Sequence, residues 1–549
     1  MDLWNAITRP AKLALRPAEL AKTMLQPALI AKTLAGAGLV DLRRPDQSVR
    51  MFDILRRWGP VAGAPFVGAL RTPDRDAVLD ERGAITFRGL NDETNAIARA
   101  WRERGIGEGD VVGILCRNHR WMLEAAFASA KVGATGVYMN TMFAAPQLID
   151  VCRREGVKVL VFDEEFAAIA SVAPAEHRFV AWSEPSTVLV TLEQLAASTD
   201  RAAVPPPVAR GRLVLLSSGT SGTPKGAPRS KPRGVLTASA ILSKVPLRVH
   251  ESTMIASPLF HALGWLQATL AFALGTTMVL RRTFDPEATL ALLDANRCSA
   301  LVVVPVMLQR ILDLGDETIE KYDTTSLRVI LVSGSNLSSE LGTLVMDRFG
   351  DVVYNLYGST EVAWATIATP DDLRAAPGCA GKSPLGTTVR LYDEHDVVIH
   401  EAGSIGRIFV ANGMSFEGYT GGGTKRVLDG LMATGDVGHF DDTGRLFVDG
   451  RDDEMIVSGG ENVFPAEIEE LLVQHDAVAD AAVIGVDDAV FGQRLKAFIV
   501  PKVGVVLSED DIKSYVRRNL ASYKVPRDIT FLNELPRNAT GKVLKRSLV

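Results

Sequence analysis

The chain has 549 residues, of which 47% are hydrophobic and 23% charged, which is ordinary for a soluble globular protein and long enough for two or more domains. Sixty basic against 65 acidic residues give a formal net charge of −5, so no basic field points to a nucleic-acid partner. No uncharged apolar run approaches the roughly 18 residues of a membrane-spanning helix. The four cysteines form no CxxC pair and the eight histidines show no HExxH spacing, so we expect reduced thiols in a cytoplasmic protein and no protein-bound transition metal.

The first 48 residues form an extension that differs from the rest of the chain. Residues 10–14, 17–21 and 27–31 repeat one short pattern, and each predicts a short helix because its leading proline suits the first helical turn. Basic residues outnumber acidic ones in residues 1–40, and Leu, Ile and Met occupy many other positions. This composition predicts an amphipathic segment at an anionic membrane surface, with an extension packed on the protein itself as the alternative. A signal peptide is disfavoured, since prolines and lysines interrupt any apolar core.

Between residues 49 and 449, short apolar runs alternate with helix-length segments. Apolar strands separated in this way predict parallel β/α layers. Beyond residue 385 the segments shorten and glycines multiply, which predicts a more antiparallel β region. The expected elements are a strand at 84–90 leading into a helix through 95–104, a helix at 121–132, and strands at 111–115, 159–162, 213–216, 301–304 and 329–332.

The pattern changes again at residues 450–453. Residues 454–549 have the size of a small separate domain. Ser508 and Asp511 come close to a capping box at the start of its last helix. The expected elements are helices at 465–474 and 508–520 and strands at 481–484 and 495–500. The predicted fold is therefore α/β, with a large N-terminal domain of β/α layers, a β subdomain and a small α+β C-terminal domain.

The strongest chemical signal is the loop at residues 217–226, which follows an apolar strand. It holds five hydroxyl side chains, three glycines and Lys225. Glycines let backbone N–H groups turn toward an anion, hydroxyls add donors, and lysine supplies a mobile positive charge for phosphate oxygens. Lys225 lies between proline and glycine, so this is not a Walker A loop. We interpret the segment as a phosphate-binding loop; the alternative is a flexible surface loop.

Three later stretches carry side chains suited to a nucleotide. The ring of Tyr357 is suited to stacking on a purine, and Glu361 suits Mg²⁺, which keeps its waters and takes few protein ligands. Asp436, on a turn, suits hydrogen bonds from ribose hydroxyls, and Lys542 lies on a glycine-containing loop near the end of the chain. Read alone, each stretch also fits an ordinary role as a polar turn or a solvated side chain.

Together these stretches resemble, over nearly the whole chain, the adenylate-forming superfamily of acyl-CoA synthetases, luciferases and peptide-synthetase adenylation domains. The resemblance implies a two-step reaction that uses ATP, Mg²⁺ and coenzyme A. A carboxylate attacks the α-phosphate of ATP to give an acyl-adenylate and pyrophosphate, and the CoA thiol then displaces AMP. It also implies a mobile C-terminal domain that rotates between the two steps. The matching stretches, in order, are residues 217–226, 257–264, 334–336, 357–361, 434–436, 450–451, 459–461 and 541–542.

The resemblance also implies roles for single residues. Glu361 and Thr220 would bind Mg²⁺, and with Lys542 they are the expected catalytic residues. Lys542 would reach the carboxylate and the α-phosphate in the first step only. The nucleotide-binding residues would be Ser217, Ser218, Gly219, Thr220, Ser221, Gly222 and Lys225 for the β- and γ-phosphates, Gly334, Ser335, Asn336, Tyr357 and Gly358 around adenine, Thr360 at the α-phosphate, and Asp436 and Arg451 at the ribose. The remaining assignments are Asp453 at the hinge and Gly459, Gly460 and Glu461 along the pantetheine channel of CoA.

The acyl substrate is indicated by residues 257–265, a mostly apolar segment whose alternative role is core packing. It holds no acidic residue to pair with an amino group, so an amino acid substrate is disfavoured. His261, Gly264 and Trp265 resemble the pocket segment of long-chain members, in which an aromatic residue at the Trp265 position gates a fatty-acyl tunnel. No carrier domain follows Lys542. The expected enzyme is therefore an AMP-forming fatty acyl-CoA synthetase for medium- or long-chain acids.

Several alternatives share the same adenylation residues. An aryl-CoA ligase, a fatty acyl-AMP ligase serving a carrier protein and a luciferase-like oxygenase are the enzymatic ones. A catalytically silent lipid-binding or scaffold relative is the non-enzymatic one, against which the presence of Lys225, Glu361, Asp436 and Lys542 argues. The expected partners are a fatty acid and CoA, with peripheral contact at the inner face of the membrane through residues 1–40; a homodimer stays open.

Overall fold

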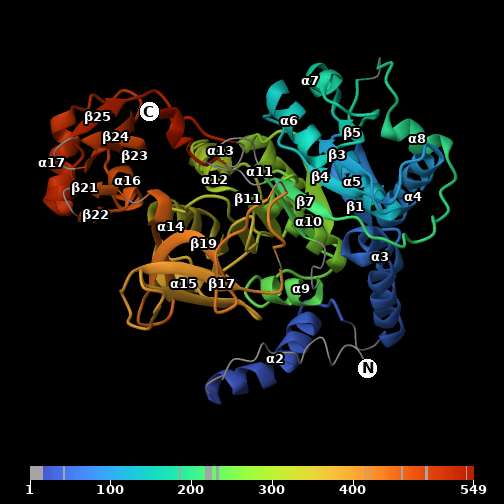
Figure 1. Cartoon of the computed structure of the whole chain (residues 1–549), viewed down its shortest axis with the longest axis horizontal. Coiled ribbons are helices and arrows are strands. Elements are labelled where there is room, and N and C mark those ends of the chain that lie inside the picture. The colour runs from blue at the N-terminus through green and yellow to red at the C-terminus, as the bar shows by residue number, and fades with distance from the viewer. Residues whose placement is uncertain are drawn as a thin grey trace.

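In the computed structural model the described residues form four β-sheets, with helices packed around the two parallel ones (Figure 1). The chain starts the largest sheet, builds a second parallel sheet, returns to complete the first, and ends in two further sheets. No described helix combines the length and apolar character needed to cross a bilayer. The structure describes residues 17–40, 44–184, 187–216, 225–229, 234–414, 416–420, 422–454, 456–458, 461–488, 492–538 and 541–548.

The largest sheet has eight strands in the order β14-β13-β12-β11-β9-β10-β1-β2. Strands between its two edges run parallel, whereas the edge strands β14 and β2 pair antiparallel. Its central strands are continuous apolar runs because helices cover both faces of the sheet. The bounds are β1 Asp76–Asp80, β2 Gly83–Thr86, β9 Ser252–Ile255, β10 Thr277–Leu280, β11 Ala300–Val303, β12 Val329–Val332, β13 Val353–Tyr357 and β14 Thr366–Ala368.

The second sheet has the order β6-β5-β3-β4-β7-β8 and is parallel except for β8. Strand β8 pairs antiparallel with β7, with Leu216 opposite Gly226, so the two ends of the predicted phosphate loop lie side by side. The parallel layers predicted from the sequence are confirmed. The bounds are β3 Val111–Leu115, β4 Thr135–Tyr138, β5 Val159–Phe162, β6 His177–Val180, β7 Leu213–Leu216 and β8 Gly226–Arg229.

A common core joins helices from the two parallel sheets. Phe127 of α5 packs edge-to-face on Phe272 of α10, with ring centroids 4.8 Å apart, and both side chains are buried. Burying each large apolar side chain contributes about 1.5–3 kcal/mol, so this cluster holds the two sheets together. The helices are α4 Phe87–Glu103, α5 Arg120–Val132, α6 Ala145–Glu155, α7 Ala167–Val172, α8 Leu192–Ser198, α9 Gly234–Leu242, α10 Ala262–Leu274, α11 Pro286–Ala295, α12 Pro305–Leu312, α13 Asp316–Ile319, α14 Ser339–Phe349 and α15 Pro370–Ala375.

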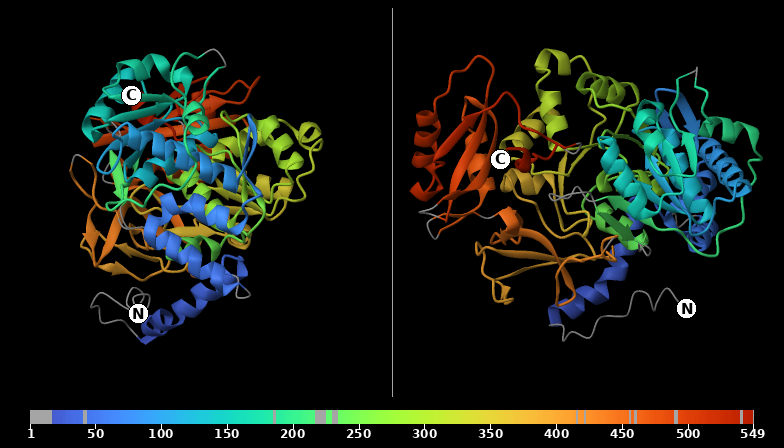
Figure 2. Two further views of the ribbon diagram at one scale, coloured as in Figure 1. Left: turned by 90° about the vertical axis from the view of Figure 1, so that its right-hand side faces the viewer. Right: turned by 45° about the horizontal axis from the view of Figure 1, so that its top comes forward.

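Two further sheets follow, as Figure 2 shows in two further views. The first is wholly antiparallel, which confirms the expectation for the chain beyond residue 385. The second belongs to the C-terminal α+β unit, in which only β25 pairs parallel. The strands are β15 Thr388–Tyr392, β16 Val398–Ile399, β17 Gly406–Ala411, β18 Val427–Leu428, β19 Leu431–Phe440, β20 Leu446–Arg451, β21 Ile456–Ser458, β22 Glu461–Val463, β23 Val478–Asp488, β24 Gly492–Pro501 and β25 Asp528–Phe531, and the helices are α16 Pro465–Val473 and α17 Glu509–Asn519.

The N-terminal segment differs from its prediction. Instead of separate short helices, the chain from residue 17 forms one helix, α2 (Pro17–Gly36), which continues through Pro27 at the loss of one backbone hydrogen bond. The first proline repeat, residues 10–14, lies outside the described residues. A second helix, α3 (Pro45–Arg71), was not predicted; it is interrupted at Gly59, whose φ of 76° is left-handed.

The strand expected at residues 84–90 is also shorter than predicted. Strand β2 ends at Thr86, whose side chain accepts a hydrogen bond from the backbone N–H of Gly89 and so caps α4. The buried Phe87 and Leu90 then belong to the first turns of the helix. At the other end of the chain the capping prediction holds, because Ser508 and Asp511 form a complete capping box on α17.

Candidate active site

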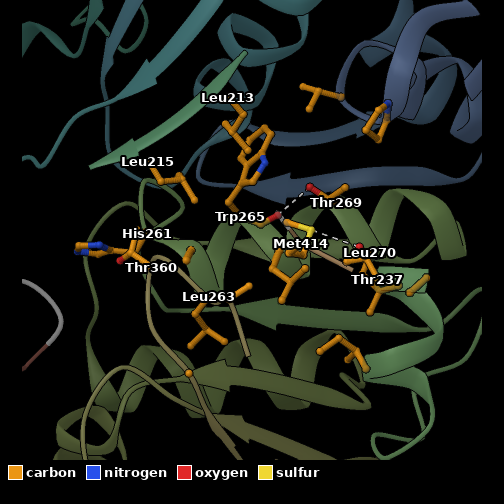
Figure 3. A pocket seen from close by; sticks show the side chains of 18 of the residues that line it. Leu213, Leu215, Thr237, His261, Leu263, Trp265, Thr269, Leu270, Thr360 and Met414 are labelled. Atoms are coloured by element: carbon orange, nitrogen blue, oxygen red, sulfur yellow. Dashed lines mark hydrogen bonds between the residues drawn. The ribbon is translucent and has the colours of Figure 1, made fainter. Parts of the chain in front are cut away.

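One cavity of about 660 Å³ joins a polar end to a long apolar arm. Its volume is within the range of about 300–1,000 Å³ that is typical of small-molecule sites. Figure 3 shows His261 and Thr360 on one side of the cavity, Leu263 and Trp265 near its middle, and Leu270 on the far side. The polar end is lined by Lys225, Ser333, Gly334, Gly358, Ser359, Thr360, Glu361, Tyr419, Lys425, Asp436, Arg451 and Lys542.

Asp436 is held between the largest sheet and the antiparallel sheet. It lies on β19 directly opposite Arg451 of β20, whose Nη1 is 3.2 Å from Asp436 Oδ1. Tyr357, at the end of β13, donates its hydroxyl to Asp436 Oδ2 at 2.5 Å. Burial, and then the adjacent Asp436 charge, raise the pKa of Tyr357 well above its ordinary value, so the phenol remains a donor. The structure therefore brings together three of the residues predicted for the nucleoside: Tyr357, Asp436 and Arg451.

Glu361 is oriented by two hydroxyl groups. Tyr419 donates to its Oε1 at 2.6 Å, and Ser359 donates to its Oε2 at 2.8 Å. Burial, followed by the hydrogen bond to Glu361, raises the pKa of Tyr419 and keeps it protonated. The ring of Tyr419 lies 5.5 Å from Lys225 Nζ, so the predicted phosphate lysine and the predicted metal carboxylate share one neighbour.

The base of the predicted phosphate loop is fixed from two sides. Gly226 N donates to Thr420 Oγ1 at 3.0 Å, and the same hydroxyl donates to Glu155 Oε1 at 2.6 Å. A Cβ atom on Gly226 would lie 2.5 Å from Thr420 Oγ1, which explains why glycine stands there. Lys225, the last predicted residue of the loop, is exposed toward the cavity. The other predicted loop residues, Ser217, Ser218, Gly219, Thr220, Ser221 and Gly222, lie outside the described residues.

Lys542 reaches the same cavity from the C-terminal unit. Its backbone N–H donates to Asn538 Oδ1 at 2.9 Å, and Asn538 N donates back to the Lys542 carbonyl at 2.9 Å. Gly541, with φ of 78°, turns the loop against α12, where a Cβ would lie 2.5 Å from Val306. The observed arrangement therefore places Lys542 on the wall of the same cavity that Thr360, Glu361 and Asp436 line.

The start of α10 forms the junction between the polar end and the apolar arm. Gly264 allows the first turn to pack on the preceding segment, because a Cβ there would lie 2.4 Å from the Pro258 carbonyl. Trp265 is 4% exposed and packs on Tyr138 with ring centroids 4.6 Å apart. Burial lowers the pKa of His261 to about 4, and its buried Nε2 has no hydrogen-bond partner in the described structure. His261 is therefore a neutral side chain at the junction.

The remaining predicted residues lie farther from the cavity or outside the description. Gly334 lines the cavity, whereas Ser335 and Asn336 follow it and do not. Asp453 lies in the 3₁₀ turn Asp452–Glu454, which connects β20 to the C-terminal sheet. Gly459 and Gly460 are outside the described residues, as is the side chain of Glu461 at the start of β22. The hinge and the CoA channel thus stay predictions.

Several contacts of the site escaped sequence reasoning. Tyr419 and Thr420 have no distinctive local pattern, and their partners Glu361 and Glu155 are distant in the sequence. The contacts of Ser359 and Lys425 are local, but neither residue was assigned a role from the sequence. Only a clustering of hydroxyl side chains near Glu361, and a tyrosine in a glycine-rich stretch, could have marked them. Three-dimensional proximity is what reveals them.

A buried cluster of Cys116, His119 and Asp163 brings together three side chains of the kinds that bind metals, with their ligand atoms within 4.8 Å of one another. His119 Nδ1 accepts a hydrogen bond from Met122 N, so Nε2 carries the proton and donates it to Asp163 Oδ1 at 2.7 Å. Both ring nitrogens are thus engaged within the protein. The cluster anchors the N-terminus of α5, and no transition-metal site is derived from it.

Comparison with known proteins decides the family. The model of the AMP-binding enzyme family matches residues 67–420, and that of its C-terminal domain matches residues 467–542. The chain belongs to the AMP-binding enzyme family. Its members include adenylate-forming acyl- and aryl-CoA ligases, and the predicted superfamily and fold are confirmed.

Individual relatives of this AMP-binding enzyme act on different acids. An indoleacetate–CoA ligase of Aromatoleum aromaticum is 32% identical, covering 88% of this chain and 94% of the relative. A fatty acid–[acyl-carrier-protein] ligase, ScoC, of Streptomyces coeruleorubidus is 30% identical, covering 87% and 94%. The o-succinylbenzoate CoA synthetase of Bacillus subtilis, solved with its acyl-adenylate intermediate, superposes with a TM-score of 0.77 at 26% identity, covering 88% and 97%.

Replacing Lys542 of this AMP-binding enzyme should affect its two half-reactions differently. Lys542→Ala removes a positive charge from the cavity and should slow adenylate formation by about 10²–10³-fold, the usual cost of one preorganised charge-stabilising group. Conversion of a supplied acyl-adenylate to thioester should continue. Pyrophosphate release and thioester formation, measured separately, test this; equal loss of both contradicts the assignment.

The buried neutral His261 should make stability depend on pH. Its pKa of about 4 in the folded state lies below its ordinary value of 6.5, so between these values the unfolded chain binds a proton that the folded chain does not. The stabilising contribution of neutral His261 is therefore fully present above pH 6.5 and is lost as the pH is lowered toward 4. Denaturant unfolding of wild type and His261→Phe across this range measures the effect, and identical pH slopes contradict it.

Proposed function

We propose that the protein activates a medium- or long-chain fatty acid as an acyl-adenylate and transfers the acyl group to coenzyme A. The observation that supports this substrate is the apolar arm, which continues beyond Trp265 among aliphatic and aromatic side chains. Such a lining gains about 0.8 kcal/mol for each methylene group that it removes from water. An aryl acid would fill only the part of the arm next to the junction.

In the proposed mechanism the carboxylate of the substrate lies at the junction near His261. One of its oxygens forms a bond to the α-phosphorus of ATP, and the bond from that phosphorus to the bridging oxygen of pyrophosphate breaks. Lys542 would neutralise charge on the carboxylate and the α-phosphate, and Lys225 would do so on the leaving phosphates. The neutral His261 adds no charge that would hold the carboxylate away from phosphorus.

The nucleoside would be held by the pair of residues on β19 and β20. The Asp436 carboxylate, positioned by Tyr357 and Arg451, is an acceptor for the ribose hydroxyls. In the second step the CoA thiol gives up its proton to water, and its sulfur forms the thioester bond with the acyl carbon. The bond from that carbon to the phosphate oxygen breaks, and AMP leaves with its electron pair. Lys542 has no role in this step, which is why a movable unit carries it.

The residues present fit a magnesium ion. Glu361 is 8% exposed, lines the cavity, and has both oxygens oriented by neutral hydroxyl donors. One carboxylate, together with phosphate oxygens and waters, is a usual ligand set for Mg²⁺. Thr220, the second predicted ligand, stays a prediction. When bound, the ion would neutralise negative charge on the phosphate oxygens.

Two other functions are favoured by particular relatives. The indoleacetate–CoA ligase points to an aryl acid, and ScoC, a fatty acid–[acyl-carrier-protein] ligase, points to a carrier protein in place of CoA. Both would use the same polar end of the cavity. They differ from the main proposal in the acid or in the thiol acceptor, so substrate profiling separates them.

Profiling should show a preference for long alkyl chains. Pyrophosphate release and thioester formation are measured with ATP, Mg²⁺ and CoA on acids from acetate to stearate, beside indoleacetate, ferulate and 2-succinylbenzoate. We expect kcat/KM to rise through the medium- and long-chain acids, and thioester to form with CoA. A maximum among the aryl acids establishes the aryl alternative, and pyrophosphate without CoA thioester establishes the carrier-protein alternative.

We also propose that residues 1–40 contact an anionic membrane surface from the cytoplasmic side. Their basic and apolar composition supports this, as does α2, which extends beyond the large domain at the lower edge of Figures 1 and 2. Deleting residues 1–25 should reduce co-sedimentation with vesicles containing anionic lipid but not with neutral vesicles. Unchanged binding after the deletion rejects this proposal.

A further inference from the structure

The apolar arm is lined in part by residues that precede the matched family region. That region begins at residue 67, whereas α2, the following turn and the first half of α3 precede it. In Figure 3 the blue ribbon of α3 lies on the side of the cavity away from His261 and Thr360. The lining residues from this segment include Leu34, Leu39, Val40, Met51, Phe52 and Leu55.

The turn after α2 is attached firmly to the large domain. The Arg71 guanidinium donates through Nη2 to the Gly38 carbonyl at 2.9 Å, and through Nη1 to the carbonyls of Leu39 at 3.2 Å and Ala273 at 3.0 Å. These bonds connect the turn to the C-terminal end of α10. Leu34 and Leu39 are buried in the core cluster that includes residues of α9 and α10. This wall of the arm is thus a fixed part of the fold.

The first half of α3 is fixed at the point where the helix is interrupted. Arg210 donates to the carbonyl of Arg56 and, at 3.3 Å, to that of Arg57, and so satisfies the end of this half-helix. Trp58 stacks on Phe66 of the second half, with ring centroids 4.7 Å apart. Phe66 in turn lies 4.3 Å from the buried Lys131 Nζ of α5. The half-helix therefore holds a defined position from which its apolar face lines the cavity.

We infer that residues 34–40 and 44–58 end the acyl arm and set the longest chain that the enzyme accepts. This inference rests on the proposed function. Phe52 and Leu55 are half-buried and line the arm, so added volume at these positions removes space from the end of the chain. The matched family model begins at residue 67, so this wall lies outside it.

The test compares Leu55→Trp with Val49→Trp across the alkyl acid series. Val49 lies on the same half-helix, is 67% exposed and does not line the cavity, so it is a matched control. Leu55→Trp should move the optimum to shorter acids and lower kcat/KM for the longest acids about tenfold or more. That loss is expected if two methylene groups of the acid no longer fit, because each buried methylene contributes a factor of about four to kcat/KM. Short acids should react at wild-type rates, and Val49→Trp should keep the wild-type profile.

A second variant, at another position of the same wall, tests the inference independently in case Leu55→Trp does not fold. Val40→Phe adds volume from the turn after α2, and it should shift the optimum in the same direction; thermal unfolding midpoints verify that each variant is folded. If wild type prefers long acids and both folded variants keep its profile, the inference is overturned while the proposed function stands. If wild type shows no preference among alkyl acids, the proposed function fails and the inference falls with it.

Discussion

Asp436 is the group on which the arrangement of the site depends. Its carboxylate is 9% exposed and receives Tyr357 from the largest sheet and Arg451 from the neighbouring antiparallel strand. A buried carboxylate without such partners would cost several kcal/mol, so the pairing constrains how the two sheets meet. Thr360 and Glu361 follow the strand that carries Tyr357 and line the same cavity. The pairing of Tyr357 with Asp436 therefore also positions the polar end of the cavity.

The cavity combines two environments that favour different parts of one substrate. At the polar end, lysines and an arginine line the cavity together with carboxylates, and the half-buried hydroxyl groups of Ser359 and Tyr419 orient Glu361. In the arm, apolar side chains favour hydrocarbon and disfavour charge. The neutral His261 marks the boundary. Under the proposed function, an amphiphilic acid would therefore bind with its carboxylate toward the nucleotide and its chain toward α3.

Sequence reasoning predicted best what is encoded locally. Strands β3 and β5 coincide with their predictions because each is a continuous apolar run, and Ser508 with Asp511 specifies the start of α17 through contacts three residues apart. The chain alone could not predict α2 as one helix, since Pro27 normally ends a helix and here does not.

The long-range contacts of the site were also beyond local patterns. Tyr419 meets Glu361 only through the fold, as Arg71 meets the turn after α2. The apolar arm is formed by residues that precede residue 67, where the matched family region begins, and by residues that follow it. No single sequence motif therefore describes the arm. Motifs identified the nucleotide chemistry, whereas substrate length is a property of packing.

The most direct test of one continuous site is calorimetric titration with non-hydrolysable acyl-adenylate analogues of increasing chain length. If the arm continues from the adenylate site, affinity should rise about fourfold for each added methylene and then level off when the arm is full. An affinity that does not change with chain length, equal to that of the nucleotide portion alone, would contradict the account.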